Sequence, residues 1–219
     1  MLKDHQAISA ISREINASAE DIIGRLGHGT ITQEPDLTSQ LITSIRIKLN
    51  GLLFNNLHVN VDSHVLDDRA PGAEESIYGA DLLCTVEINT HGFSARKGFL
   101  AQAKLVRRPD LQFENAQANE LSRQCRLMLN HTSEAFVWVY STTGIFVVPA
   151  ITAVSVSKRP WSYQDVYYRN LRGFFTLFMS CFVGEERISS AHPTVLHAIK
   201  DSTKNHLLIT INDNTEINS

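Results

Sequence analysis

Two β-rich segments joined by a short turn constrain the fold of this 219-residue chain more than any other feature. Residues 80–88 (ADLLCTVEI) and 97–105 (KGFLAQAKL) are rich in residue types that favour strands. The linker between them contains Gly92, which suits a tight turn. The two segments are therefore predicted to pair as an antiparallel hairpin.

Helical and strand patterns surround this hairpin on both sides. Apolar residues recur at helical spacing in residues 6–26, which suggest two helical pieces, and in residues 38–54, which suggest the first core helix. The other predicted elements are a strand at 57–66, a helix at 114–129, strands at 135–141 and 144–150, a helix at 163–183 and an edge strand at 206–213.

The order of these elements predicts an α/β fold with a mixed β-sheet core flanked by helices. One domain is expected over residues 1–219, because the chain is long enough to bury a single core. We expect a helical N-terminal arm at 1–33, an αβββαββ core at 34–150, and a C-terminal helix and edge strand at 151–219.

The composition indicates which partners and which cellular compartment suit the protein, but not which reaction it catalyses. The formal net charge of −3 argues against a protein that coats nucleic acid through general electrostatics, so any contact must come from a local basic patch. No signal peptide or membrane span is predicted. The three cysteines are far apart and suggest neither a disulfide framework nor a zinc knuckle, which predicts a cytoplasmic protein: Cys84, Cys125 and Cys181.

Polar residues at the two ends of the hairpin form the candidate site. Asp81 begins the first strand, and Gln102 and Lys104 end the second, two positions apart and therefore on one face. Carboxylate and amide oxygens, with the backbone carbonyl of Ala103, suit a hard cation such as Mg²⁺ or Mn²⁺. The lysine ammonium can orient or deprotonate a water and offset charge on a phosphate. The pattern predicts metal-dependent phosphodiester hydrolysis.

One carboxylate is few for magnesium, so a further acid is expected near Asp81. The candidates are Glu34 or Asp36, just before the predicted first core helix, and Glu75, shortly before the GAD tripeptide. Glu87 and Glu74 are weaker candidates.

The segments EESIYGAD and GFLAQAK resemble the PD-(D/E)xK nuclease superfamily, in the branch where QxK replaces ExK, as in Mrr-type restriction nucleases. They are still more similar to nuclease domains of bacterial anti-phage defence systems. The likeness covers roughly residues 34–150. It implies a restriction-endonuclease-like fold, with Glu34 on the first helix, Asp81 on the second strand, and Gln102 and Lys104 on the third.

This resemblance implies a metal-dependent endonuclease, acting on DNA rather than RNA, in defence or restriction. Cutting both strands requires two sites, so a homo-oligomer is expected. The short chain leaves little room for a sensor domain, so the trigger of a defence nuclease is expected to lie in a partner sensor protein or in oligomerisation. The alternative is a catalytically silent nucleic-acid-binding or scaffold subunit, since Gln102 removes one charge from the site. A second alternative is an enzyme that cuts RNA or nicks one strand.

The residues singled out above also have simpler, purely structural interpretations. The GAD and QAK tripeptides are also what polar strand ends look like, although residue type, order and strand placement together favour a site. Lys104, Arg107 and Arg108 are candidates for nucleic-acid binding, but the two arginines could equally serve solubility. Gln124 and Arg126 could contact a phosphate backbone or lie on a solvated helix face.

Overall fold

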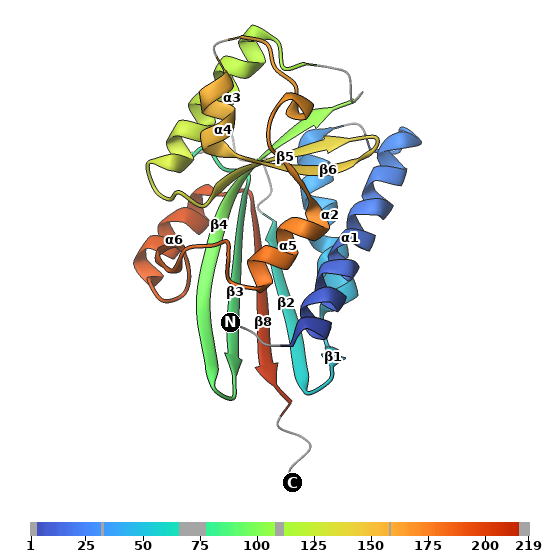
Figure 1. Ribbon diagram of the computed structural model, residues 1–219, viewed down its shortest axis with the longest axis vertical. Coiled ribbons are helices and arrows are strands. Elements are labelled where there is room, and N and C mark those ends of the chain that lie inside the picture. Colours follow the sequence, from blue (N-terminus) through green and yellow to red (C-terminus); the bar gives the residue numbers. More distant parts are fainter. Residues whose placement is uncertain (1–3, 32, 66–77, 108–111, 158, 215–219) are drawn as a thin grey trace.

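The computed structural model describes residues 4–31, 33–65, 78–107, 112–157 and 159–214, and it confirms an α/β protein with one mixed sheet (Figure 1). Within these residues the sheet has eight strands in the order β1-β2-β8-β3-β4-β5-β6-β7. The strands are β1 Leu52–Phe54, β2 Leu57–Val65, β3 Leu82–Thr90, β4 Phe93–Val106, β5 Ala135–Ser141, β6 Gly144–Pro149, β7 Arg169–Asn170 and β8 Asn205–Asp213.

Helices cover both faces of the sheet and enclose two apolar cores. One core is packed by α1 His5–Gly27, α2 Glu34–Leu49 and α5 Leu171–Met179. The other is packed by α3 Asn115–Leu129, α4 Ala150–Val156 and α6 Pro193–Ser202. Short 3₁₀ helices lie at Tyr163–Asp165 and Glu186–Ile188. Of the described helices, none combines the length and apolarity needed to span a bilayer.

The predicted hairpin is confirmed as β3 and β4, which pair antiparallel with Leu82 opposite Ala101. The helix α3 then connects β4 to the parallel strand β5. Along β4, Phe99 and Ala101 enter the first core, whereas Leu100 enters the second. Gln102 therefore points to the same face as Leu100, toward α3.

The N-terminal prediction needs two corrections. Residues 5–27 form one continuous helix rather than two pieces, because apolar residues stay in register along its whole length and Ile11, Ile15 and Ile22 are buried in the first core, where α1 packs mainly against α2 and α5. The first core helix begins at Glu34 and ends at Leu49, earlier at both ends than predicted. Proline in the first turn suits such a helix start.

The predicted C-terminal edge strand is not at an edge. β8 lies inside the sheet, antiparallel to β2 and parallel to β3, with Leu82 opposite Asn205. Its position follows from its composition, because Leu207, Ile209 and Ile211 are fully buried. The C-terminal segment is thus a central part of the core.

The predicted helix at 163–183 is shorter than expected. Only Leu171–Met179 is α-helical, because Asn170 caps the helix by accepting a hydrogen bond from the Gly173 N–H at 2.8 Å. Neither α4 nor α6 is predicted by the sequence patterns.

Candidate functional site

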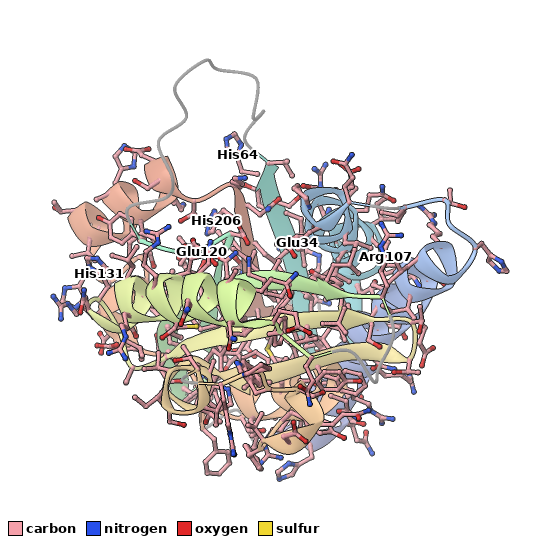
Figure 2. The ribbon with its side chains drawn as sticks, turned by 90° about the horizontal axis from the view of Figure 1, so that it is seen from above. Glu34, His64, Arg107, Glu120, His131 and His206 are labelled. Carbon is pink, nitrogen blue, oxygen red and sulfur yellow. The ribbon has the colours of Figure 1, made fainter. Side chains whose placement is uncertain are left out.

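A cavity of about 180 Å³ lies where the start of β3, the end of β4 and the first turn of α2 meet the middle of α3. Figure 2 views the molecule from this end, with Glu34 at the start of α2 and Glu120 on α3. The cavity is lined by Glu34, Pro35, Thr38, Asp81, Gln102, Ala103, Lys104, Gln124, Lys204 and Asn205.

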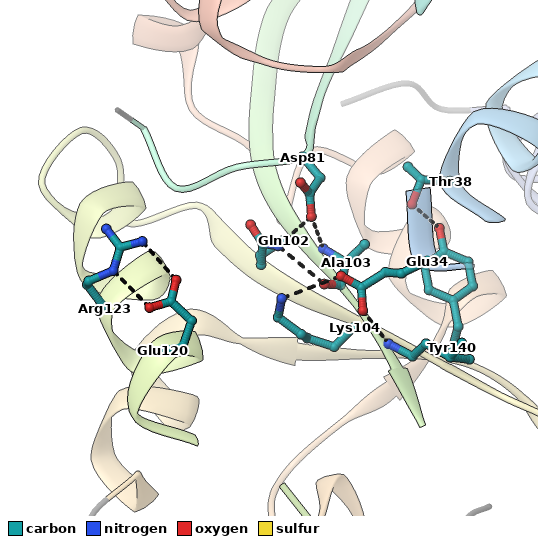
Figure 3. Close-up of polar contacts among 10 residues, drawn as sticks. Glu34, Thr38, Asp81, Gln102, Ala103, Lys104, Glu120, Arg123 and Tyr140 are labelled. Atoms are coloured by element: carbon teal, nitrogen blue, oxygen red, sulfur yellow. Dashed lines mark hydrogen bonds and ion pairs between the residues drawn. The ribbon is translucent and has the colours of Figure 1, made fainter. Parts of the chain in front are cut away.

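Asp81 is held by the strand next to it (Figure 3). Its Oδ2 atom accepts a hydrogen bond from the Ala103 backbone N–H at 3.0 Å and another from the side-chain amide of Gln102. The Gln102 amide also donates to the Ala103 carbonyl at 3.3 Å. The carboxylate is therefore fixed against the QAK segment, as the predicted hairpin requires.

Glu34 provides the second carboxylate from the first turn of α2. Its Oε2 accepts from the Leu105 backbone N–H at 2.7 Å, and its Oε1 lies 3.4 Å from the Lys104 ammonium. Both side chains are partly exposed, at 20% for Lys104 and 29% for Glu34. The pair is thus accessible from the cavity rather than sealed in the core.

The approach of the GAD segment to α3 depends on a glycine. Gly79 has φ +67°, and a Cβ atom there would lie 2.3 Å from the backbone oxygen of Gln124. Only glycine tolerates this conformation and this contact together. Gly79 therefore allows α3 to form a wall of the cavity directly beside Asp81.

Two further residues complete the walls from distant parts of the sequence. The side-chain oxygen of Gln124 is buried and, among the described residues, has no hydrogen-bond partner. Lys204 joins the cavity from the turn between α6 and β8. Gln124 was a candidate phosphate contact, but Lys204 was missed, because nothing local in the sequence relates it to the GAD segment.

Electrostatics at Asp81 reflect this enclosure. Burial raises the pKa of the Asp81 carboxyl above its ordinary value, because the charged form loses hydration. The hydrogen bond from Ala103 and the charge of Lys104 oppose the shift, whereas the nearby charge of Glu34 adds to it. The two carboxylates are therefore close enough to repel each other, a situation that a bound cation would relieve.

A larger groove of about 570 Å³ runs beside the cavity and shares Glu34 and Lys104 with it. Its other lining residues come from the end of β4 and the start of α3, namely Leu105, Val106, Arg107, Gln112, Phe113, Ala116, Gln117 and Glu120. Figure 2 places Arg107 and Glu120 along this side. Glu120 is itself paired with Arg123 at 2.8 Å, so its charge is partly compensated.

The structure brings together most of the predicted site residues. Glu34, Asp81, Gln102, Ala103 and Lys104 line the cavity, and Arg107 lies in the adjoining groove. Glu74, Glu75 and Arg108 lie outside the described residues. Asp36 is exposed and does not line the cavity, and Glu87 lies further along β3, opposite Arg96.

Two carboxylates and two amide or carbonyl oxygens are compatible with a hard cation. In the described part of the chain, no three His, Cys, Asp or Glu side chains come together as a metal cluster. Magnesium often retains several waters and needs only one or two protein carboxylates. The Gln102 amide nitrogen faces Asp81, so its oxygen would need a half-turn of the amide to become a ligand. The donor set fits Mg²⁺ or Mn²⁺, with water completing the shell.

Comparisons with protein-family models, with curated proteins and with solved structures found no match to this chain. The function of this chain is therefore inferred from the site itself.

Proposed function

We propose that the chain is a metal-dependent nuclease that hydrolyses phosphodiester bonds, with a restriction-endonuclease-like arrangement of its core. The observation that carries this proposal is the convergence of Glu34, Asp81, Gln102 and Lys104 on one cavity. These side chains come from a helix start and from two paired strands. Their order and types are those of the family that the sequence resembles.

In this proposal Asp81, Glu34 and the Gln102 side-chain oxygen would hold a Mg²⁺ or Mn²⁺ ion, and the Ala103 carbonyl is a further candidate ligand. When bound, such an ion polarises a phosphate and lowers the pKa of a coordinated water. The protein positions these oxygens in advance, since the backbone N–H groups of Ala103 and Leu105 already orient the two carboxylates.

Lys104 supplies the positive charge that phosphodiester hydrolysis needs. Its ammonium is held beside Glu34 at the junction of the cavity and the groove. There it can stabilise negative charge on the phosphate and orient the attacking water. When a phosphate replaces Glu34 as the partner of the Lys104 ammonium, the positive charge of Lys104 stays paired with a negative group.

The adjoining groove is a suitable path for the strand that is cut. It begins at Glu34 and Lys104 and continues past Arg107, whose guanidinium suits a neighbouring phosphate. We favour DNA as the substrate, as the resemblance implies. Double-strand cutting would require two such sites, hence a homo-oligomer. A role in anti-phage defence rests on the same resemblance. The cytoplasm as its location follows from the three scattered cysteines, and a partner sensor protein from the small size of the chain.

A second function is a nuclease-like subunit that binds nucleic acid without cutting it. The observation that favours it is the amide at position 102, which donates to Asp81 and thereby satisfies the carboxylate without a cation. This subunit would use the same groove and the same Lys104.

Digestion assays separate the two functions. Purified protein is incubated with plasmid DNA, single-stranded DNA and RNA in Mg²⁺, Mn²⁺ or EDTA, and Lys104→Ala is compared with the control Arg13→Ala, an exposed residue of α1 that lines neither the cavity nor the groove. The nuclease proposal predicts cutting that requires metal, is lost in Lys104→Ala and persists in Arg13→Ala. Binding of DNA without cutting under any metal would instead support the silent subunit, and preferential cutting of RNA would reassign the substrate.

A further inference from the structure

Asn205 is the polar residue that links the two carboxylate-bearing elements. It begins β8, is 2% exposed and lines the cavity. Its backbone N–H donates to the Asp81 carbonyl at 3.0 Å, and its side-chain Nδ2 donates to the same oxygen at 3.1 Å. β8 thus contacts the GAD segment at the residue that carries the first carboxylate.

The other end of the Asn205 amide contacts α2. Its Oδ1 accepts a hydrogen bond from the Ser39 hydroxyl at 3.1 Å. Ser39 lies just over one helical turn after Glu34, and helix geometry transmits its position to that residue. A single side chain therefore joins the helix that carries Glu34 to the strand that carries Asp81.

The two bonds satisfy the buried amide of Asn205 itself, but the groups at their far ends have other partners. The Asp81 carbonyl already accepts from the Asn205 backbone N–H, and the Ser39 hydroxyl lies 3.0 Å from the Pro35 carbonyl, an alternative acceptor within its own helix. Backbone pairing between β3 and β8 also persists without the amide. What the side chain adds is a fixed separation between the two elements.

We propose that Asn205 is a positioning residue, which sets the separation of the Glu34 and Asp81 carboxylates so that one divalent cation can bind both. The inference rests on the proposed nuclease function. Residues outside the ligand set that orient metal ligands commonly change metal affinity about 10-fold to 100-fold when mutated. Asn205 acts on the metal site through Ser39 and through the Asp81 backbone.

The test measures Mn²⁺ binding without substrate, by the electron paramagnetic resonance signal of free Mn²⁺. Asn205→Ala and Ser39→Ala are each expected to weaken Mn²⁺ binding by about 10-fold. Because both break the same link, the double variant should be about as weak as either single variant, rather than showing the product of their effects. Ser39→Thr keeps the hydroxyl and should bind Mn²⁺ like wild type.

The control is Thr203→Val, which removes a different buried hydrogen bond, from Thr203 to the Ile199 carbonyl at 2.6 Å; the hydrogen bonds of Thr203 go to Ile199 and Lys200 of α6. It should retain Mn²⁺ affinity while its melting temperature falls. Thermal unfolding without metal identifies any variant that fails to fold. If Asn205→Ala does not fold, the comparison of Ser39→Ala with Ser39→Thr, at a partly exposed position, still tests the positioning role.

The possible failures are distinguishable. If wild type neither binds Mn²⁺ nor cuts nucleic acid, the proposed nuclease fails and the positioning role fails with it. If wild type binds Mn²⁺ but Asn205→Ala and Ser39→Ala bind it equally well, the positioning role alone is overturned. The same holds if Thr203→Val weakens binding as much as they do.

Discussion

Strand β4 contains two lysines in different environments. One is enclosed by the fold, and the other lies in the candidate site. Lys97 lies in the middle of the strand and is 5% exposed. Its ammonium donates to the carbonyls of Phe178 and, at 2.6 Å, Val183, near the end of α5, and it lies 4.6 Å from the Phe178 ring. Burial lowers the pKa of Lys97 to about 8.

Lys104, at the other end of the strand, lies beside a cavity and a groove rather than in a closed environment. Its contact with Glu34 is longer, at 3.4 Å, and partly exposed. The polar groups around Lys97 are satisfied by the fold itself, whereas those around Lys104 face space that a ligand can enter. On this strand, the enclosed lysine therefore has a structural role, and the accessible lysine belongs to the candidate site.

Loss of the first carboxylate should have the largest effect. Asp81→Asn is expected to lower cleavage by about a thousand-fold, roughly 4 kcal/mol in the barrier, because an amide cannot replace a charged metal ligand. The fold should persist, since the amide oxygen can still accept from Ala103. Plasmid cleavage and thermal unfolding measure both. The control Glu87→Gln removes a carboxylate from the same strand, and an equal loss of cleavage there would refute a specific role for Asp81.

The buried His206 on β8 should make the free energy of unfolding depend on pH. His206 donates to or accepts from Thr85 at 3.2 Å, and burial, with the charge of Lys200, lowers the pKa of His206 to about 4. Between pH 6.5 and 4 the unfolded chain takes up a proton that the folded chain does not, so stability falls as pH falls through this window. The cost should approach about 3 kcal/mol at pH 4.

Chemical denaturation of wild type and His206→Gln at pH 7 and pH 4 measures this dependence. The free energy of unfolding of the variant should fall less on acidification than that of wild type. Parallel losses in the two proteins would show that other groups control acid stability.

The glycine beside the site should be more sensitive than one in an open turn. Gly79→Ala is expected to lower the free energy of unfolding by about 2 kcal/mol, because it combines positive φ with a contact of 2.3 Å to the α3 backbone. Gly92→Ala, also at positive φ but with nothing within 4 Å of the added carbon, should cost about 1 kcal/mol. Denaturant titrations measure the free energy of unfolding of both variants. Equal losses would mean that α3 shifts away from the added Cβ atom without measurable strain.

Removal of the buried lysine should have the smallest effect. Lys97→Met is expected to lower the free energy of unfolding by about 1 kcal/mol, because the Phe178 and Val183 carbonyls lose their donor while the methionine still fills the space. Cleavage by the folded variant should equal that of wild type. A loss of cleavage at unchanged stability would show that Lys97 contributes to catalysis, and the two lysines would then not differ in role.

Sequence patterns predicted the parts of this molecule that depend on neighbouring residues. The β3–β4 hairpin and α3 follow from alternation and helical periodicity, and the hairpin brings Asp81 to Gln102 by local geometry alone. Glu34 lines the same cavity as Asp81, Gln102 and Lys104, although its helix was expected to begin later.

The remaining features depend on contacts between distant segments. The insertion of β8 between β2 and β3 brings Asn205 and Lys204 to the cavity, and no local pattern encodes that pairing. The burial of Lys97 depends likewise on α5, which lies about eighty residues further along the chain. The helix predicted at 163–183 is shorter because Asn170 begins it by accepting a hydrogen bond from the Gly173 N–H, a contact that apolar periodicity does not reveal.

The most direct test of the central claim compares the two lysines of β4 in one cleavage assay. Wild type, Lys104→Met and Lys97→Met are incubated with plasmid in Mg²⁺, Mn²⁺ or EDTA, at equal concentrations of folded protein. Metal-dependent cutting by wild type and Lys97→Met, with none by Lys104→Met, is the predicted result. Cutting by Lys104→Met at the wild-type rate, or no metal-dependent cutting by wild type, would contradict it.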